Sequence, residues 1–186
     1  MLHLDDPDEG LSPVTSHARF TELAPPEFFD EGDDFAPFGS DDGHDTLRGL
    51  EDFYREHGPN ADAADFLTAL LREWEFDVPH DISDARAEHL VAWLAEDEMN
   101  EVFLTSESRA RVAAALGELK ITGAVSPALG DEARRGLRAL EIMASDTTRY
   151  PHWPHRPDAL RALAEIERVL AAATGSGVED SAWASS

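Results

Sequence analysis

The chain has 186 residues, of which 42% are hydrophobic, so one globular domain with a real core is expected. Its 39 acidic residues outnumber 15 Lys plus Arg, and the formal net charge of -24 argues against a direct grip on nucleic-acid phosphates or an anionic membrane. The lack of cysteine excludes disulfides and thiolate chemistry. No secretory signal or bilayer-spanning stretch is visible, which favours a cytoplasmic protein.

The acidic excess has two interpretations. It serves solubility or reflects the bias of a salt-tolerant or high-GC proteome, with which Lys120 as the only lysine agrees. Alternatively, it serves to mimic nucleic acid or to dock on a basic partner. Net charge bears on solubility and association rather than on fold, so it does not decide between the two.

Residues 1–40 carry five prolines and two acidic clusters, DDPDE and DEGDD, and show no helical period. The same segment is too rich in large apolar side chains for a disordered tail. These side chains are Phe20, Leu23, Phe28, Phe29, Phe35 and Phe38. We therefore expect an extended aromatic-acidic arm that packs on a helical body, with a short helix near PPEFF.

Apolar residues recur at intervals of three and four from residue 41 onward, which predicts helices. The first runs from residue 41 to Gly58-Pro59, and the second from Asn60 or Asp62 to Val78-Pro79. The third begins at Ser83 or Asp84 and reaches Leu94, with a possible kinked extension through Phe103.

A fourth helix is expected from Ser106 to about Gly123, and a fifth from Ser126-Pro127 to about Ala144. Three prolines interrupt RYPHWPHRP at 149–157, and a last helix follows over 158–173. No β-branched alternation is present. The prediction is all-α: an irregular bundle of five or six helices at 41–173, preceded by the arm at 1–40 and followed by a flexible tail at 174–186.

Two blocks of the sequence carry a family resemblance. They are EFFDEGDDFAPFGSDDGHDTLRGLEDFYREHG and ALGELKITGAVSPALGDEARRGLRALE. With them the chain resembles the YfeS-like family of uncharacterised bacterial proteins. The resemblance implies kinship and fold over most of the chain, and it implies no catalytic residues, since no activity comes with the family. His44 stands where that family has a small residue after the second glycine.

The stretch FAPFGSDDGHDTL at 35–47 has a structural and a functional interpretation. As structure, Ser40 and the aspartates after it cap a helix, while the aromatic residues before it pack on the first turns. As a site, three carboxylates offer oxygens that a hard cation prefers, although their spacing is not that of the twelve-residue calcium loop. The candidate binding residues here are Phe38, Asp41, Asp42, His44 and Asp45.

A second candidate lies in the proline-rich loop, where the binding residues are Tyr150, His152, Trp153 and His155. Two histidines three apart are a start for a zinc or iron site, but no third ligand stands at a diagnostic spacing. The alternative is that Trp153 anchors the loop in a groove while the histidines face water. No phosphate loop, dinucleotide fingerprint or nucleophile elbow is present, so no cofactor and no metal are predicted.

Three functional hypotheses follow from these patterns. The leading one is a non-catalytic module that binds another protein through an exposed face or its aromatic arm. A narrower version is an acidic inhibitor, such as an immunity protein or nucleic-acid mimic, that captures a basic partner. The third is a metal-assisted hydrolase built on Asp41, Asp42 and His44 or on the 152–155 loop, which requires at least three of these side chains to converge in a pocket.

Overall fold

The structure is a computed structural model that describes residues 1–6 and 10–175. Within these residues every regular element is helical, apart from one isolated bridge between Asp6 and Gly10, which confirms the all-α class. The α-helices are α1 (Ala18–Leu23), α2 (Asp41–His57), α3 (Ala63–Trp74), α4 (Ala87–Leu94), α5 (Glu98–Thr122), α6 (Pro127–Ser145) and α7 (Arg156–Thr174). Two 3-10 turns, η1 (Pro26–Phe29) and η2 (Ile82–Asp84), lie between them. Most of the predicted tail lies outside the described residues.

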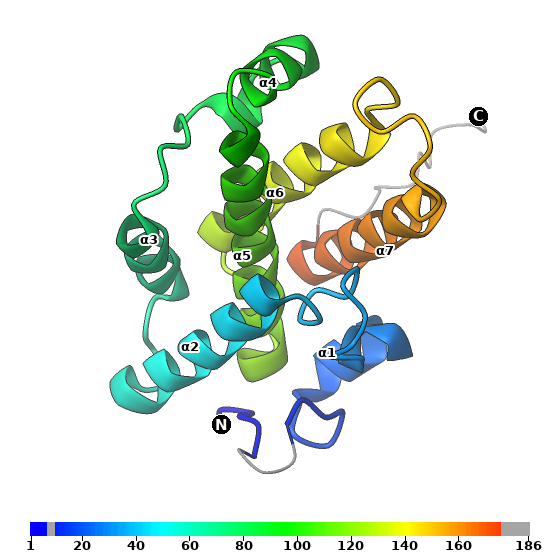
Figure 1. Ribbon diagram of the computed structural model, residues 1–186. Helices are drawn as coiled ribbons and strands as arrows, with labels where there is room; N and C mark the ends of the chain where they lie inside the picture. The colour runs from blue at the N-terminus through cyan, green and yellow to red at the C-terminus, as the bar shows by residue number, and fades with distance from the viewer. Residues whose placement is uncertain (7–9, 176–186) are drawn as a thin grey trace, which may run out of the picture.

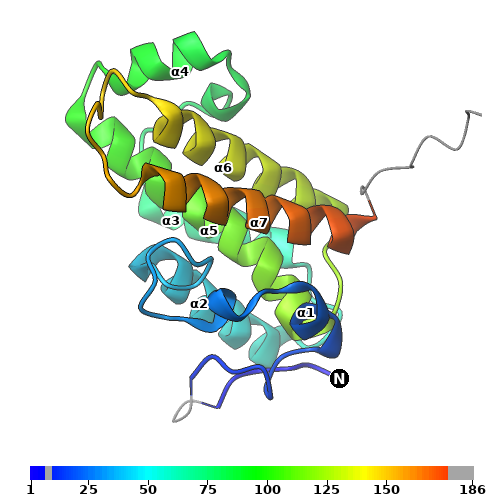
Figure 2. The same ribbon diagram turned by 90° about the vertical axis from the view of Figure 1, so that its right-hand side faces the viewer.

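Helix α5 runs through the middle of the molecule (Figure 1), and the other long helices pack around it. Every residue of α5 from Val112 to Ile121 is buried, including the charged Glu118 and Lys120, so the helix is covered on all sides there rather than along one stripe. Helix α6 returns along α5, and α7 lies beside α6 (Figure 2). Helix α2 crosses the opposite side of α5 and leads into α3 (Figure 1).

Local sequence explains where the helices begin and end. The hydroxyl of Ser40 accepts the Gly43 N–H at the start of α2, and Asp62 and Asp97 cap α3 and α5 in the same way. Helix α5 ends at Gly123, whose φ of 82° lies in the left-handed region that favours glycine. The expected bounds of α2 and α6 agree closely with the structure.

The boundary between the expected third and fourth helices was predicted wrongly. The break lies at residues 95–97, where Asp97 caps the new helix, and Ser106 lies inside α5 rather than at its start. A serine inside a helix cannot be told from a helix cap by its residue type alone. Here the helix starts earlier, because Asp97 rather than Ser106 is its cap. The expected kinked continuation of the third helix is thus the first part of α5.

The segment before α2 contributes directly to the core. Phe20 of α1, Phe28 of η1 and Phe38 are each buried to at least 97%, and the Phe20 ring lies 6.2 Å from that of Phe38. The segment also contains α1 and η1, so it is not extended throughout. Its role as an aromatic-acidic arm stays a prediction.

The first residues of the chain run along the C-terminal end of α5. The His3 N–H donates to the Ile121 carbonyl at 2.9 Å, and the His17 N–H donates to the Lys120 carbonyl at 2.8 Å. Over residues 1–6 and 10–175, no helix has the length and apolar character that crossing a bilayer needs.

Candidate functional site

A pocket of about 370 Å³ lies between α5, α6 and α7 and is bordered by the two loops that the sequence singled out. The helices contribute Glu101, Thr105, Arg109, Val112, Leu140, Met143, Ala144, Ala159, Leu163 and Ile166. The loop before α2 contributes Asp34, Phe35, Ala36, Pro37 and Ser40, and the loop between α6 and α7 contributes Tyr150 and Trp153. Most of these side chains are apolar, so the pocket favours an apolar occupant.

The loop before α2 is shaped by two close backbone approaches. A Cβ at Gly39 would lie 1.9 Å from the Asp33 carbonyl oxygen, and a Cβ at Gly43 would lie 2.3 Å from the Pro37 carbonyl oxygen. Only glycine tolerates such contacts, because the obstructing atoms belong to the backbone. The Gly-Ser-Asp-Asp-Gly run thus folds the loop back on the first turn of α2, which places Phe35 and Pro37 at the pocket.

The loop at 146–155 is fixed by two arginines. The Arg149 guanidinium lies 2.7 Å from the Glu101 carboxylate and donates to the Leu94 carbonyl at 3.0 Å. Arg156 donates to the Ala144 carbonyl at 2.8 Å and also to the Tyr150 carbonyl. These bonds tie the loop to α4, α5 and α6 and hold Tyr150 at the rim of the pocket.

Tyr150 is tied to the pocket by its hydroxyl, which donates to the Glu101 carboxylate. Burial raises the pKa of Tyr150 above its ordinary value, and the hydrogen bond to Glu101 raises it further. A tyrosine phenol is protonated at neutral pH even at its ordinary pKa, and the upward shift keeps Tyr150 a donor to higher pH. Both oxygens of Glu101 are engaged, one by Tyr150 and one by Arg149.

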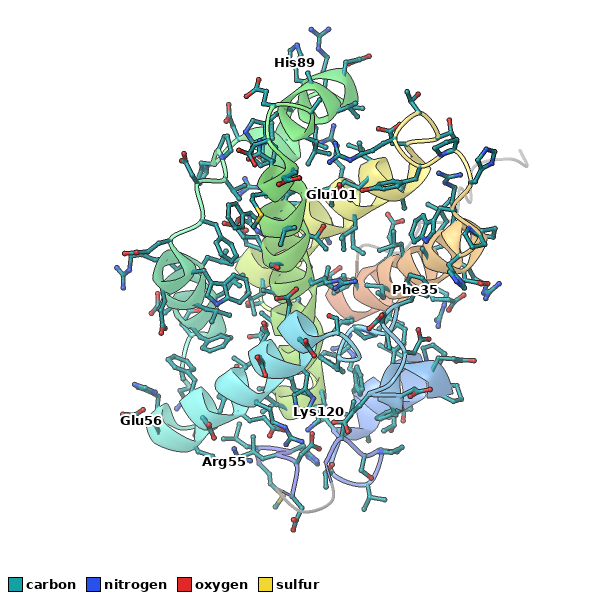
Figure 3. The ribbon with its side chains drawn as sticks, in the orientation of Figure 1. Phe35, Arg55, Glu56, His89, Glu101 and Lys120 are labelled. Carbon is teal, nitrogen blue, oxygen red and sulfur yellow. The ribbon has the colours of Figure 1, made fainter. Side chains whose placement is uncertain are left out.

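The two loops meet through aromatic rings. The Phe35 ring centroid lies 6.3 Å from that of Trp153 in an edge-on arrangement, and the Trp153 centroid lies 6.4 Å from that of Tyr150. Figure 3 shows Phe35 on the loop before α2 and Glu101 near the start of α5. The segments that the sequence singled out thus form one aromatic rim, although they lie more than a hundred residues apart.

None of the candidate binding residues at 38–45 is among the residues that line this pocket, whereas Ser40, which was predicted as a helix cap, is one of them. Phe38 is 1% exposed and belongs to the core. Asp41 and Asp45 are exposed on the first turns of α2, and Asp42 is half-buried. The Nδ1 of His44 lies 3.5 Å from the Glu31 carboxylate. A binding role for these residues stays a prediction, separate from the pocket.

The predicted residues at 150–155 divide between the pocket and solvent. Tyr150 and Trp153 line the pocket, whereas His152 and His155 are exposed. Over the described part of the chain, no group of three or more His, Asp or Glu side chains is placed to hold a metal ion. The convergence that the metal-assisted hydrolase requires is therefore missing among those residues.

Sequence reasoning missed the pocket residues of α5. Glu101, Thr105 and Arg109 are spaced by four and therefore lie on one helix face, a pattern that was visible in the sequence. What the sequence did not contain was the identity of the elements that cover this face. The pocket arises where that stripe meets two loops that are remote along the chain.

Fold and pocket together define an all-α protein with an apolar pocket between three helices and two aromatic loops. In sequence, the chain is 34% identical over 140 residues to the uncharacterised protein YfeS of Escherichia coli (strain K12). The alignment covers 74% of this chain and 54% of YfeS, so the chain spans about half the length of the curated relative that it matches. This similarity confirms the resemblance to the YfeS-like family. No protein-family model and no solved structure matches the chain.

Proposed function

We propose that this protein is a cytoplasmic, non-catalytic module that binds another protein. The pocket receives an apolar group of that partner. The observation that carries the proposal is the pocket itself. Its volume of about 370 Å³ lies near the lower end of the range for ligand sites, and its walls are mostly apolar. A site of that size suits one or two large side chains.

The polar groups at the pocket support binding rather than chemistry. The Glu101 carboxylate is occupied by Arg149 and Tyr150, and the Ser40 hydroxyl accepts the Gly43 N–H. These groups are therefore engaged in holding the loops. The other two lining hydroxyls, of Ser40 and Thr105, contact the Gly43 N–H and the Met143 sulfur and no carboxylate or histidine among the described residues, so neither is paired with a general base as covalent catalysis would require.

The rim of the pocket supports a protein as the partner. Tyr150 is 37% exposed, and Phe35 and Trp153 are half-buried beside it. Aromatic side chains that are partly exposed at a pocket mouth provide large contact area at small entropic cost, and they are enriched at protein interfaces. We propose that Phe35, which belongs to the aromatic part of the N-terminal arm, contacts the partner at this rim.

A pocket-filling variant tests the proposal. Thr105→Phe places a ring in the pocket and removes only a weak contact of the threonine hydroxyl with Met143. Thr68→Phe is the matched control, because Thr68 is exposed on α3 away from the pocket. The probe is the neutral fluorescent molecule N-phenyl-1-naphthylamine, and a partner captured from lysate is tested for displacement by it.

The expected result is that wild type and Thr68→Phe bind the probe, while Thr105→Phe binds it at least about tenfold more weakly, because the filled site excludes it. A partner that uses the pocket is captured by the first two proteins and is released by the probe. Equal probe binding by all three proteins would exclude the pocket as the binding site.

The acidic inhibitor is a second candidate, favoured by the formal charge of -24 and by the acidic run at 30–34 next to the pocket. Asp30, Glu31 and Asp34 of this run are exposed. Such a surface would speed the capture of a basic protein, and the affinity would fall steeply with added salt. Binding to a basic partner that is insensitive to salt between 50 and 500 mM, roughly a threefold change in Debye length, would count against this candidate.

A further inference from the structure

Arg109 is a cation that lines the apolar pocket without an ion-pair partner that the structure describes. It is half-buried, and none of the described residues forms a hydrogen bond or ion pair with its side chain. Two other arginines, Arg72 and Arg86, also lack such a partner in the described part of the chain, but both are exposed to solvent. Arg109 is thus distinguished by its combination of partial burial and lack of a partner.

A shortage of carboxylates does not explain this isolation. The chain has 39 acidic residues, and the neighbouring Arg111 on α5 is paired with both Glu107 and Glu132. Removing a charge from water is costly unless it gains a partner, and a guanidinium is suited to a carboxylate, which it binds with two parallel hydrogen bonds. The position of Arg109 therefore indicates that the pocket's occupant is anionic.

We infer that the occupant is the C-terminal residue of a partner chain, with a large apolar side chain in the pocket and a free carboxylate on Arg109. Only at a C-terminus does one residue carry both groups, since the carboxylates of Asp and Glu have short stems that would leave the apolar walls uncovered. This inference rests on the proposed function and names the group that the pocket receives.

The charge around the pocket adds a second requirement for the partner. Asp34 lines the pocket, is exposed, and has no hydrogen bond or ion pair with any residue that the structure describes. The whole chain carries a formal charge of -24, which repels a ligand whose only charge is a carboxylate. A basic residue shortly before the C-terminus would meet Asp34 and offset this repulsion, so the tail we expect is basic, then apolar, then carboxylate.

The test compares two forms of the same peptide that differ only in the C-terminal group. A set of acetylated seven-residue peptides ends in Leu, Phe or Trp, carries Lys at the fourth position from the end, and is made with either a free carboxylate or an amide. Isothermal titration calorimetry with the full chain measures both forms. For at least one peptide we expect the free acid to bind about tenfold or more tightly than the amide, since a charge-assisted bond is lost in the amide.

Variants of Arg109 identify the cation responsible. Arg109→Gln is expected to remove the preference for the acid while leaving the affinity for the amide unchanged, and Arg109→Lys, which keeps the charge but not the planar fork, is expected to reduce it only in part. Arg72→Gln is the matched control, as it removes an exposed arginine outside the pocket and should preserve the preference. The unfolding midpoint of each variant is also measured, to verify that the variant is folded.

The inference is overturned if acid and amide bind wild type equally, if no peptide of the set binds, or if Arg109→Gln weakens both forms alike. It is also overturned if 4-phenylbutanoate, a free acid with no peptide bond, binds more tightly than every peptide. These outcomes are separate from a failure of the proposed function, because the neutral probe N-phenyl-1-naphthylamine reports on the pocket without using Arg109.

Discussion

Lys120, the only lysine in the chain, lies in the core, and its side chain is fully buried. Its Nζ lies 2.9 Å from the Asp5 carboxylate and 2.8 Å from the Glu51 carboxylate, and it also donates to the His3 carbonyl. The lysine thereby joins α5, α2 and the first residues of the chain. A buried charge of this kind is tolerated only because its partners are in place.

Replacing this lysine should destabilise the protein strongly. In Lys120→Met the two buried carboxylates lose their shared cation, and we expect a loss of about 3 kcal/mol, at the lower end of the range for broken buried pairs because Arg55 still contacts Glu51. Urea unfolding measures it. Arg161→Met, which removes an exposed pair with Asp158, should cost less than about 1 kcal/mol. Equal effects of the two substitutions would show that the buried cluster is not stabilising.

Local residue roles were predictable from the sequence, whereas tertiary ones were not. Ser40 was expected to cap a helix and does so, and of the two candidates Asn60 and Asp62 the structure uses Asp62; capping depends on the next two or three residues alone. Ser126 was expected to cap α6, but its side chain makes no capping bond, and its N–H donates to Glu118 instead. From the sequence, the lone Lys120 indicated only a bias in composition. Its structural role was not visible, because its carboxylate partners lie 69 and 115 residues away in the chain.

At the scale of elements, α5 and α6 approach each other closely at Gly136. A Cβ at Gly136 of α6 would lie 2.6 Å from the carbonyl oxygen of Ser108 and 3.3 Å from the Arg111 side chain. The carbonyl belongs to the backbone of α5, so it cannot rotate away. The two helices can pack at this distance only because residue 136 has no side chain.

Gly136→Ala should therefore lower stability although alanine is the better helix former. We expect a net loss of about 1–2 kcal/mol, as overpacking outweighs a gain in helix propensity of about 1 kcal/mol. Gly130→Ala is the control on the same helix, because its nearest obstacles are the side chains of Thr174 and Arg134, and it should be neutral or stabilising. Urea unfolding of both variants measures this; a Gly136→Ala protein as stable as Gly130→Ala would contradict the close approach.

The elements themselves were largely predictable, but their association was not. Apolar periodicity and turn residues placed α2, α3, α6 and α7, because these signals are local. The candidate pocket depends on which helix face meets which loop. Phe35 and Trp153 come together from opposite halves of the chain, and no local pattern specifies their contact.

At the scale of the whole molecule, most arginines are used internally while the acidic excess remains. Arg48, Arg55, Arg111, Arg135 and Arg149 are each bound to carboxylates within the fold. With a formal charge of -24 over 186 residues, the remaining carboxylates repel one another in the compact state more than in the unfolded chain. Screening of this repulsion should therefore favour the folded state.

We expect the thermal midpoint at pH 7 to rise by several degrees when NaCl increases from about 10 to about 100 mM, as the Debye length falls from about 30 Å to about 10 Å. Differential scanning calorimetry measures the shift. The control is the same titration at pH 5, closer to the pI of about 4.4, where protonation of carboxylates lowers the net charge and the salt effect should shrink. If the midpoint rose equally at both pH values, general salt effects on burial rather than charge repulsion would be responsible.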